Sequence, residues 1–161
     1  MDVVERALRE RGWKYQRDNP QHIITGVSVP GFTSIISIHH EEGKKTVLFL
    51  FYPSIEGTAT VKIHASAGYT PLQVARACEL LLGENYRIVL GCFERDPSDG
   101  EIRLRIALPY RDTDLSIQQV NWCIDIGFAT LAKIMQEVER QIGIPSASHQ
   151  RMRPGNVPGE V

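Results

Sequence analysis

Histidine and carboxylate side chains are the residues of this sequence whose types first suggest chemistry. His39 and His40 are adjacent, and His64 lies further along the chain. Neighbouring residues of a β-strand point to opposite faces, so we do not expect His39 and His40 to bind one ion together. A zinc site would need His64 to approach His39 from a neighbouring strand. The favoured interpretation is a strand that runs into a charged turn.

A second candidate is the pair Asp112 and Asp114, whose spacing could suit a magnesium ion. The pair directly precedes a predicted helix, where carboxylates cap free N–H groups and favour the positive end of the helix dipole. Helix capping is therefore the favoured role. The chain also has no motif for a serine nucleophile elbow, a phosphate loop, a dinucleotide site or a paired-cysteine zinc site. We accordingly predict no catalytic residue, no metal and no cofactor.

Arginines on predicted strand surfaces are the residues that could contact nucleic acid, namely Arg87, Arg103 and Arg105. The whole chain carries 18 Lys and Arg against 19 Asp and Glu, a net charge of -1, which supplies no long-range field for a polyanion. Glu94 is also predicted to lie opposite Arg103. The sequence therefore does not favour a nucleic-acid partner.

The 161 residues fit one domain, with 42% hydrophobic and 23% charged residues. The N-terminal segment lacks the apolar core of a secretory signal, and no apolar run reaches membrane-spanning length. Cys78, Cys92 and Cys123 are odd in number, far apart and set in apolar segments, which is typical of reduced, buried thiols. We expect a cytoplasmic protein with one domain over 1–143 and an extended or flexible tail over 144–161, rich in Gly, Pro and Ser.

Hydrophobic periodicity predicts an α+β domain. A first helix runs from about Val3 and stops at Gly12, and three β-branched and aromatic runs follow at 22–29, 33–40 and 45–52 as an antiparallel meander. A turn at 42–43 gives these predicted pairs: Ile38 with Val47, Ile36 with Phe49, Ser37 with Leu48, and His39 with Thr46. Residues 54–69 are ambiguous, although TATVKIHA could form a short strand.

A second helix is predicted to begin after Thr70, which can cap it, with Pro71 in the first turn, and to end at Gly83. One side of this helix carries Leu72, Ala75, Cys78, Leu81 and Leu82. A hairpin then joins YRIVLGCFER to EIRLRIALPY through a turn at 97–100. Centring the turn there gives these pairs: Phe93 with Leu104, Gly91 with Ile106, Val89 with Leu108, and Glu94 with Arg103.

The last predicted helix, capped by Asp114 or Ser116 and ending near Ile142, has two apolar faces. The broad face, expected to pack on the sheet, contains Ile117, Val120, Ile124, Phe128, Leu131, Met135, Val138 and Ile142. Trp122 and Ile126, joined by Ala129, point nearly the opposite way. Because exposed aromatic rings are characteristic of interfaces, we predict that this second face contacts a dimer mate or partner. Coverage of Trp122 by the chain's own first helix, a loop or the tail is the open alternative.

The local segments LQVARACELLLGENY, DGEIRLRIALPYRDTDLS and IQQVNWCIDIGFATLAKIMQEV, together with the element order, resemble the YbjN-type family. That family is described as putative sensory transduction regulators with a fold like that of type III secretion chaperones. The resemblance covers most of 3–141 and carries no catalytic motif. It implies partner binding, commonly as homodimers that hold an extended segment of another protein, and a regulatory part.

The sequence thus leads to one main hypothesis, a non-enzymatic cytoplasmic module that binds protein partners as a homodimer, through the sheet or the Trp122 face. A metal-dependent or small-ligand enzyme that uses His39, His64 or the Asp112 and Asp114 pair is the alternative.

Overall fold

The computed structural model describes residues 1–29, 32–55, 59–110 and 114–143. One antiparallel sheet has the strand order β1-β2-β3-β4-β7-β6, with the short β5 paired to β4. In chain order the elements are α1 Asp2–Glu10, β1 Tyr15–Asn19, β2 His22–Val29, β3 Phe32–Glu41, the 3-10 turn η1 Glu42–Lys44, β4 Thr46–Ile55, β5 Ala59–Thr60, the 3-10 turn η2 Ala65–Ala67, α2 Pro71–Asn85, β6 Cys92–Arg95, β7 Ile102–Pro109 and α3 Ile117–Ile142.

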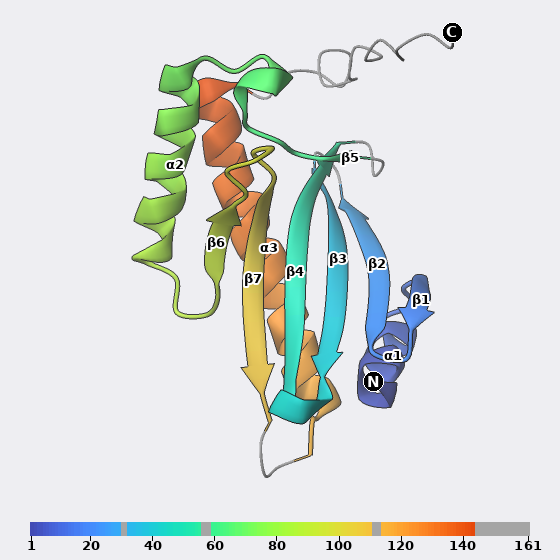
Figure 1. Ribbon diagram of the computed structural model, residues 1–161. Helices are drawn as coiled ribbons and strands as arrows, with labels where there is room; N and C mark the ends of the chain where they lie inside the picture. Colours follow the sequence, from blue (N-terminus) through green and yellow to red (C-terminus); the bar gives the residue numbers. More distant parts are fainter. Residues whose placement is uncertain (30–31, 56–58, 111–113, 144–161) are drawn as a thin grey trace, which may run out of the picture.

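The helices lie on one side of this sheet. Figure 1 shows α3 crossing behind the strands, α1 beside β1 and β2, and α2 at the opposite edge, next to β6. The predicted α+β fold, with its order of helix, meander, helix, hairpin and long helix, is confirmed. The prediction that 144–161 is extended or flexible lies outside the described residues.

The meander forms where it was predicted, but its second hairpin has a different register. Ile38 pairs with Phe49 rather than Val47, and Ser37 pairs with Leu50 rather than Leu48. The reason is a longer turn: η1 occupies 42–44, and Lys45 adopts a left-handed conformation with φ 46° before β4 begins. A shift of two residues leaves every side chain on its predicted face, because the strand period is two.

The first strand, β1, was not predicted. Its five residues, YQRDN, pair with β2 and are mostly exposed, so they lack the apolar alternation that marks a half-buried strand. The uncertain segment after β4 contributes the two-residue β5 and a single bridge between Lys62 and Glu101. The possible strand in TATVKIHA is therefore present only in part.

The last hairpin confirms the predicted pairs of Phe93 with Leu104 and of Glu94 with Arg103. The predicted extension to Gly91 and Val89 is wrong, because β6 starts at Cys92 and Val89 is fully exposed. Gly91 has φ 91°, and a Cβ there would lie 2.6 Å from the backbone oxygen of Arg105. Only a glycine fits here, because the backbone is left-handed and passes directly against β7 before β6 begins.

The second helix starts as predicted. The Thr70 side chain accepts a hydrogen bond from the Gln73 N–H, and the Gln73 side chain completes a capping box. The helix continues past Gly83 to Asn85. Its buried residues are Ala77, Leu81 and Glu84, so the apolar side predicted from Leu72, Ala75, Cys78, Leu81 and Leu82 does not lie on the core as a unit. Only Leu81 of that set is buried.

The long helix α3 provides most of the helical part of the core. Ser116 caps it with a second capping box, through Gln119. Six of the eight residues predicted to pack on the sheet are buried, whereas Ile117 and Phe128 are half-buried. The buried six are Val120, Ile124, Leu131, Met135, Val138 and Ile142. They pack on inward-facing strand residues such as Phe49, Phe51 and Ile106.

Candidate interaction surfaces

Exposed apolar side chains gather on the helical side of the molecule. Within the described ranges, the large hydrophobic residues that stay exposed are Leu72, Leu82, Tyr86, Val89 and Trp122. Four of the five belong to α2 or to the turn that follows it. The exposed fractions of Leu72, Leu82 and Tyr86 are 79%, 68% and 94%. Large exposed apolar groups that lie together on a stable fold indicate a contact surface.

Helical spacing places these α2 side chains on one stripe. Leu72, Leu82 and Tyr86 lie within about 80° of one another on a wheel of 100° per residue. Ala75 and Glu79 fall in the same sector, and both are exposed. We call Leu72, Ala75, Glu79, Leu82 and Tyr86 the α2 stripe. Because Ala77 and Leu81 hold the opposite side of the helix in the core, the stripe faces away from the domain.

The predicted contact face of α3 forms a smaller patch. The structure leaves Trp122 53% exposed and Ala129 exposed, while Ile126 is half-buried. We call these three residues the α3 patch. Arg11 of α1's C-terminal end borders it, because its guanidinium donates to both carboxylate oxygens of Asp125 at 2.8 Å. The first helix thus reaches α3 without covering Trp122, and the role of the patch as a contact stays a prediction.

A groove of about 690 Å³ separates α2 from the C-terminal half of α3. Leu80 and Ile134 contribute apolar surface to the groove. Charged residues of both signs complete the lining: Glu79, Glu84, Arg87, Lys133, Glu137 and Arg140. The buried Glu84 carboxylate accepts a hydrogen bond from Lys133 Nζ at 2.9 Å across the helix pair. Such a mixed lining gives the groove no dominant charge.

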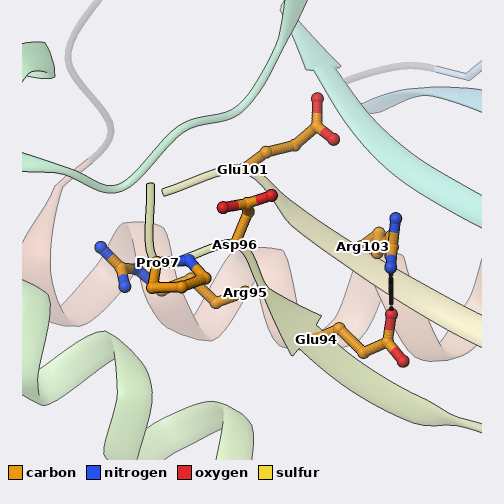
Figure 2. Close-up of a pocket in the computed structure, with 6 residues that line it drawn as sticks. All are labelled: Glu94, Arg95, Asp96, Pro97, Glu101 and Arg103. Carbon is orange, nitrogen blue, oxygen red and sulfur yellow. Dashed lines mark hydrogen bonds and ion pairs between the residues drawn. The ribbon is translucent and has the colours of Figure 1, made fainter. Parts of the chain in front are cut away.

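The hairpin β6–β7 holds a small polar pocket of about 290 Å³ (Figure 2). Figure 2 shows the Arg103 guanidinium turned toward the Glu94 carboxylate, and the two atoms Nε and Oε2 are 2.7 Å apart. Arg105 donates to the other oxygen of Glu94 at 3.1 Å. Burial raises the pKa of Glu94, but hydrogen bonds from both arginines outweigh it and the net pKa is lowered. Because one carboxylate occupies both arginines, this face offers little free positive charge for phosphates.

The candidate metal ligands do not come together. His39 pairs with Leu48 near the start of β4, whereas β5, which leads to His64, joins β4 at Ser54, near its end. His64 instead caps η2, where its Nδ1 accepts from the Ser66 N–H. Among the described residues, no three His, Cys, Asp or Glu side chains are close enough to share an ion.

The two carboxylates before α3 give a similar result. Asp114 is exposed, and the helix is capped by Ser116, the second of the two predicted caps. Asp112 lies outside the described residues. The Ser116 hydroxyl therefore caps α3. The arrangement of Asp112 and Asp114 as a magnesium pair stays untested.

A polar cluster that the sequence did not reveal lies on the helix-free face of the sheet. His22 pairs with His39 across β2 and β3, and their imidazole rings stack with centroids 4.1 Å apart. Ser37 Oγ lies 2.7 Å from His22 Nε2 and 2.8 Å from His39 Nε2. Asp18 Oδ2 lies 3.1 Å from His22 Nδ1. No sequence spacing signals this cluster, because it depends on the register of β2 against β3.

The connection from Asp18 through His22 to Ser37 has the same atom order as a serine-hydrolase triad. Catalysis of acyl transfer also requires N–H donors that stabilise an oxyanion near the serine. Ser37 lies within β3, between Ile24 of β2 and Leu50 of β4, where the two ladders engage the backbone. This surrounding supplies no free pair of backbone donors at Ser37, so the geometry does not support acyl transfer.

The cysteines differ in exposure. Cys123 is buried in α3, and burial raises the pKa of its thiol to about 11. Cys78 and Cys92 are only half-buried, so the prediction of three buried thiols holds for one of them. All three are free.

In the described part of the chain, no helix is both long enough and apolar enough to cross a membrane.

Comparisons with known proteins complete the description. No family model matches the chain, and no curated protein matches it. Among solved structures, a chain of the HopA1-SchA chaperone-effector complex is similar to this one. The similarity covers 88% of this chain and 91% of that one, with 10% sequence identity and a TM-score of 0.49. The resemblance to the YbjN-type family therefore stays a prediction.

Proposed function

We propose that this chain is a non-enzymatic protein-binding module, chaperone-like or regulatory, that acts as a homodimer. The observation that carries the proposal is the α2 stripe. Its large side chains are exposed by 68% or more, although Ala77 and Leu81 of the same helix are buried in the core. An aromatic side chain alone offers roughly 150–250 Å² of surface, and exposing several such groups to water is unfavourable unless a partner covers them.

A second copy of this chain fits the α2 stripe because the stripe is self-complementary. An antiparallel pair of α2 helices, with a two-fold axis near Glu79, places Leu72 of each copy opposite Tyr86 of the other. The same axis places Ala75 opposite Gly83, so small residues meet near the centre and the helices can approach closely. A closed dimer with one surface used by both copies requires this property.

The charges of the stripe favour the same arrangement. Arg76 and Glu79 lie near the proposed axis and already form an ion pair at 2.9 Å within one helix. In the antiparallel pair, Arg76 of each copy lies within about one helical turn of Glu79 of the other. Each arginine can therefore be shared between two carboxylates, which offsets the proximity of the two Glu79 side chains.

The α3 patch is then available for a protein partner of a different kind. Trp122 is an exposed ring beside half-buried Ile126, a composition common at the centre of interfaces.

We further propose that the module works in the cytoplasm. Three free cysteines support this location, because such thiols persist in a reducing compartment.

Sedimentation velocity over a range of concentrations tests the homodimer. We expect the wild type to sediment as a dimer and Leu82→Glu to sediment as a folded monomer, with circular dichroism as the check on folding. Trp122→Glu should remain dimeric, because its patch lies on another helix. A wild type that stays monomeric at its highest soluble concentration would rule out the homodimer.

A charge exchange locates the interface more sharply. Arg76→Glu and Glu79→Arg should each weaken the dimer, and the double variant should recover it.

Pull-down from native cytoplasm with wild type and Trp122→Glu tests the partner surface separately. Loss of captured proteins with Trp122→Glu, at unchanged dimerisation, supports the α3 patch as the partner site, and equal capture contradicts it.

A further inference from the structure

The stacked imidazoles of His22 and His39 form a compact unit in the sheet. The two residues are direct partners in the β2–β3 register, and their ring planes differ by only 9°. Both rings approach one hydroxyl, that of Ser37, through their Nε2 atoms. A single hydroxyl can donate one hydrogen bond while it accepts another. The proton positions of the two rings are therefore linked.

The hydrogen-bond chain has one consistent direction when both rings are neutral. Asp18 can only accept, so His22 must carry its proton on Nδ1, which leaves His22 Nε2 as an acceptor. Ser37 therefore donates its hydroxyl proton to His22. The Ser37 oxygen then accepts from His39, which must carry its proton on Nε2. The structure thus assigns opposite tautomers to two neighbouring histidines.

We propose that His22, Ser37 and His39 form a pH-sensitive switch: the stacked arrangement accommodates one added proton, and a second proton separates the rings. A first proton on His22 goes to Nε2, which then donates to the Ser37 oxygen while the hydroxyl proton turns away. A first proton on His39 goes to Nδ1 and leaves its Nε2–H bond to Ser37 in place. A second proton produces two cations whose ring centroids are 4.1 Å apart. Their repulsion, in a partly buried site, opposes the stack.

The other groups around the pair do not cancel this repulsion. From β1, Asp18 faces His22, but its side chain is 56% exposed. From β3, Glu41 acts on His39 but is itself paired with Lys44. The neighbouring β4 contributes Leu48 and Leu50, which are apolar. One carboxylate close to the rings balances one proton and leaves the second without a direct partner.

The environment of His39 agrees with this reading. Burial, and then the adjacent His22, lower the pKa of His39 below its usual value, and the charge of Glu41 opposes them. A histidine with a lowered folded-state pKa stabilises the fold fully above its unfolded-state pKa of about 6.5. That contribution is lost as the pH falls through the folded-state pKa.

The switch acts on a described pocket. The rings of His22 and His39 belong to the lining of a pocket of about 440 Å³ on the helix-free face, together with Asn19, Gln21, His40, Glu41, Leu48 and Leu50. Separation of the rings changes the wall of this pocket and breaks the link that Ser37 makes between β2 and β3. The low-pH form therefore differs locally in shape, at the end of the sheet near β1.

Nitrogen-15 NMR titration of the histidine rings of the intact protein tests the proposal. We expect the His39 ring to report two steps, because the charge of the stacked neighbouring ring changes within the same titration. At high pH, His22 should show the Nδ1–H tautomer and His39 the Nε2–H tautomer. In His22→Gln, His39 should titrate in one step.

A second variant separates the switch from simple proximity. Ser37→Ala should remove the hydroxyl that fixes the tautomer of each ring, while β2 and β3 stay folded and the two rings stay adjacent. The proposal is overturned if His39 titrates in one step with the same midpoint in the wild type as in His22→Gln. Opposite tautomers to those assigned would overturn it as well. Neither outcome depends on dimerisation, so the homodimer and the switch can fail independently.

Discussion

The phenyl ring of Phe51 on β4 occupies the space where a side chain on Gly127 of α3 would lie. A Cβ on Gly127 would be 2.3 Å from Cζ of Phe51. Both residues are buried. The helix therefore crosses the sheet at a short distance that only a glycine at position 127 permits. Small residues at such crossings fix the depth at which a helix packs.

Gly127→Ala should therefore destabilise the protein, although alanine is the better helix former. Overpacking of this kind costs about 1–3 kcal/mol in the free energy of unfolding. Gly43→Ala, in η1, is the control, because nothing lies within 4 Å of the added Cβ and its φ is not left-handed, so it should stabilise by up to about 1 kcal/mol. Urea unfolding of the three proteins gives both values. Equal stabilisation by the two alanines would contradict the close contact with Phe51.

The ion pair between Glu84 and Lys133 joins α2 to α3 and gives a second prediction. Glu84 is 6% exposed, so Lys133→Met leaves a buried carboxylate without its partner. We expect a loss of about 1–3 kcal/mol, partly recovered when Glu84→Gln is added. Arg140→Met breaks an exposed pair with Glu137, which water screens, and should leave the stability nearly unchanged. Similar losses for the two single variants would remove the special role of the buried pair.

Asn85 protects the edge of β6 and gives a third prediction. Its side-chain oxygen accepts from the Phe93 N–H at 2.6 Å, and its Nδ2 donates to the Phe93 carbonyl at 3.1 Å. Asn85→Ala leaves both backbone groups unpaired and should cost about 1–3 kcal/mol. Gln118→Ala, at an exposed position of α3, should change stability by about 0.5 kcal/mol or less. Thermal unfolding with light scattering should also show earlier aggregation for Asn85→Ala only.

Thiol accessibility gives a fourth prediction. The raised pKa of Cys123, about 11, and its burial keep the thiol protonated and protected at pH 8. Cys78 and Cys92 should react with Ellman's reagent in the folded protein, whereas Cys123 should react only after unfolding. Peptide mapping after brief labelling identifies the modified thiols. Rapid labelling of Cys123 in native buffer would show that the core around α3 opens readily.

The sequence predicted most elements because hydrophobic periodicity and capping residues are local signals. Thr70 and Ser116 mark the starts of α2 and α3 correctly, and the inward face of α3 follows from its spacing alone. The strand β1 was missed because it is polar and exposed. The predicted β3–β4 register was wrong by two residues, because Lys45 adopts a left-handed conformation that its residue type does not indicate.

The candidate site was predicted only in part, because it depends on what each helix face meets. The exposed position of Trp122 could be predicted, because the wheel of α3 has two separate apolar sectors, and its role as a contact stays a prediction. The outward position of Leu82 and Tyr86 could not be predicted, because α2 has apolar residues on both sides and Glu84, a charged residue, is the one that turns inward. The pairing of His22 with His39 likewise depends on the register of β2 against β3, which joins two residues 17 positions apart in sequence.

Asn85 also sets a limit on how copies of this domain can join through their strands. A linear polymer built by strand pairing needs two open edges on every copy, so that each can be both donor and acceptor. The side-chain amide already occupies the β6 edge at Phe93, and β1 forms the other boundary of the sheet. Each copy therefore keeps one open strand edge, β1, and strand pairing alone joins two chains instead of building a fibre.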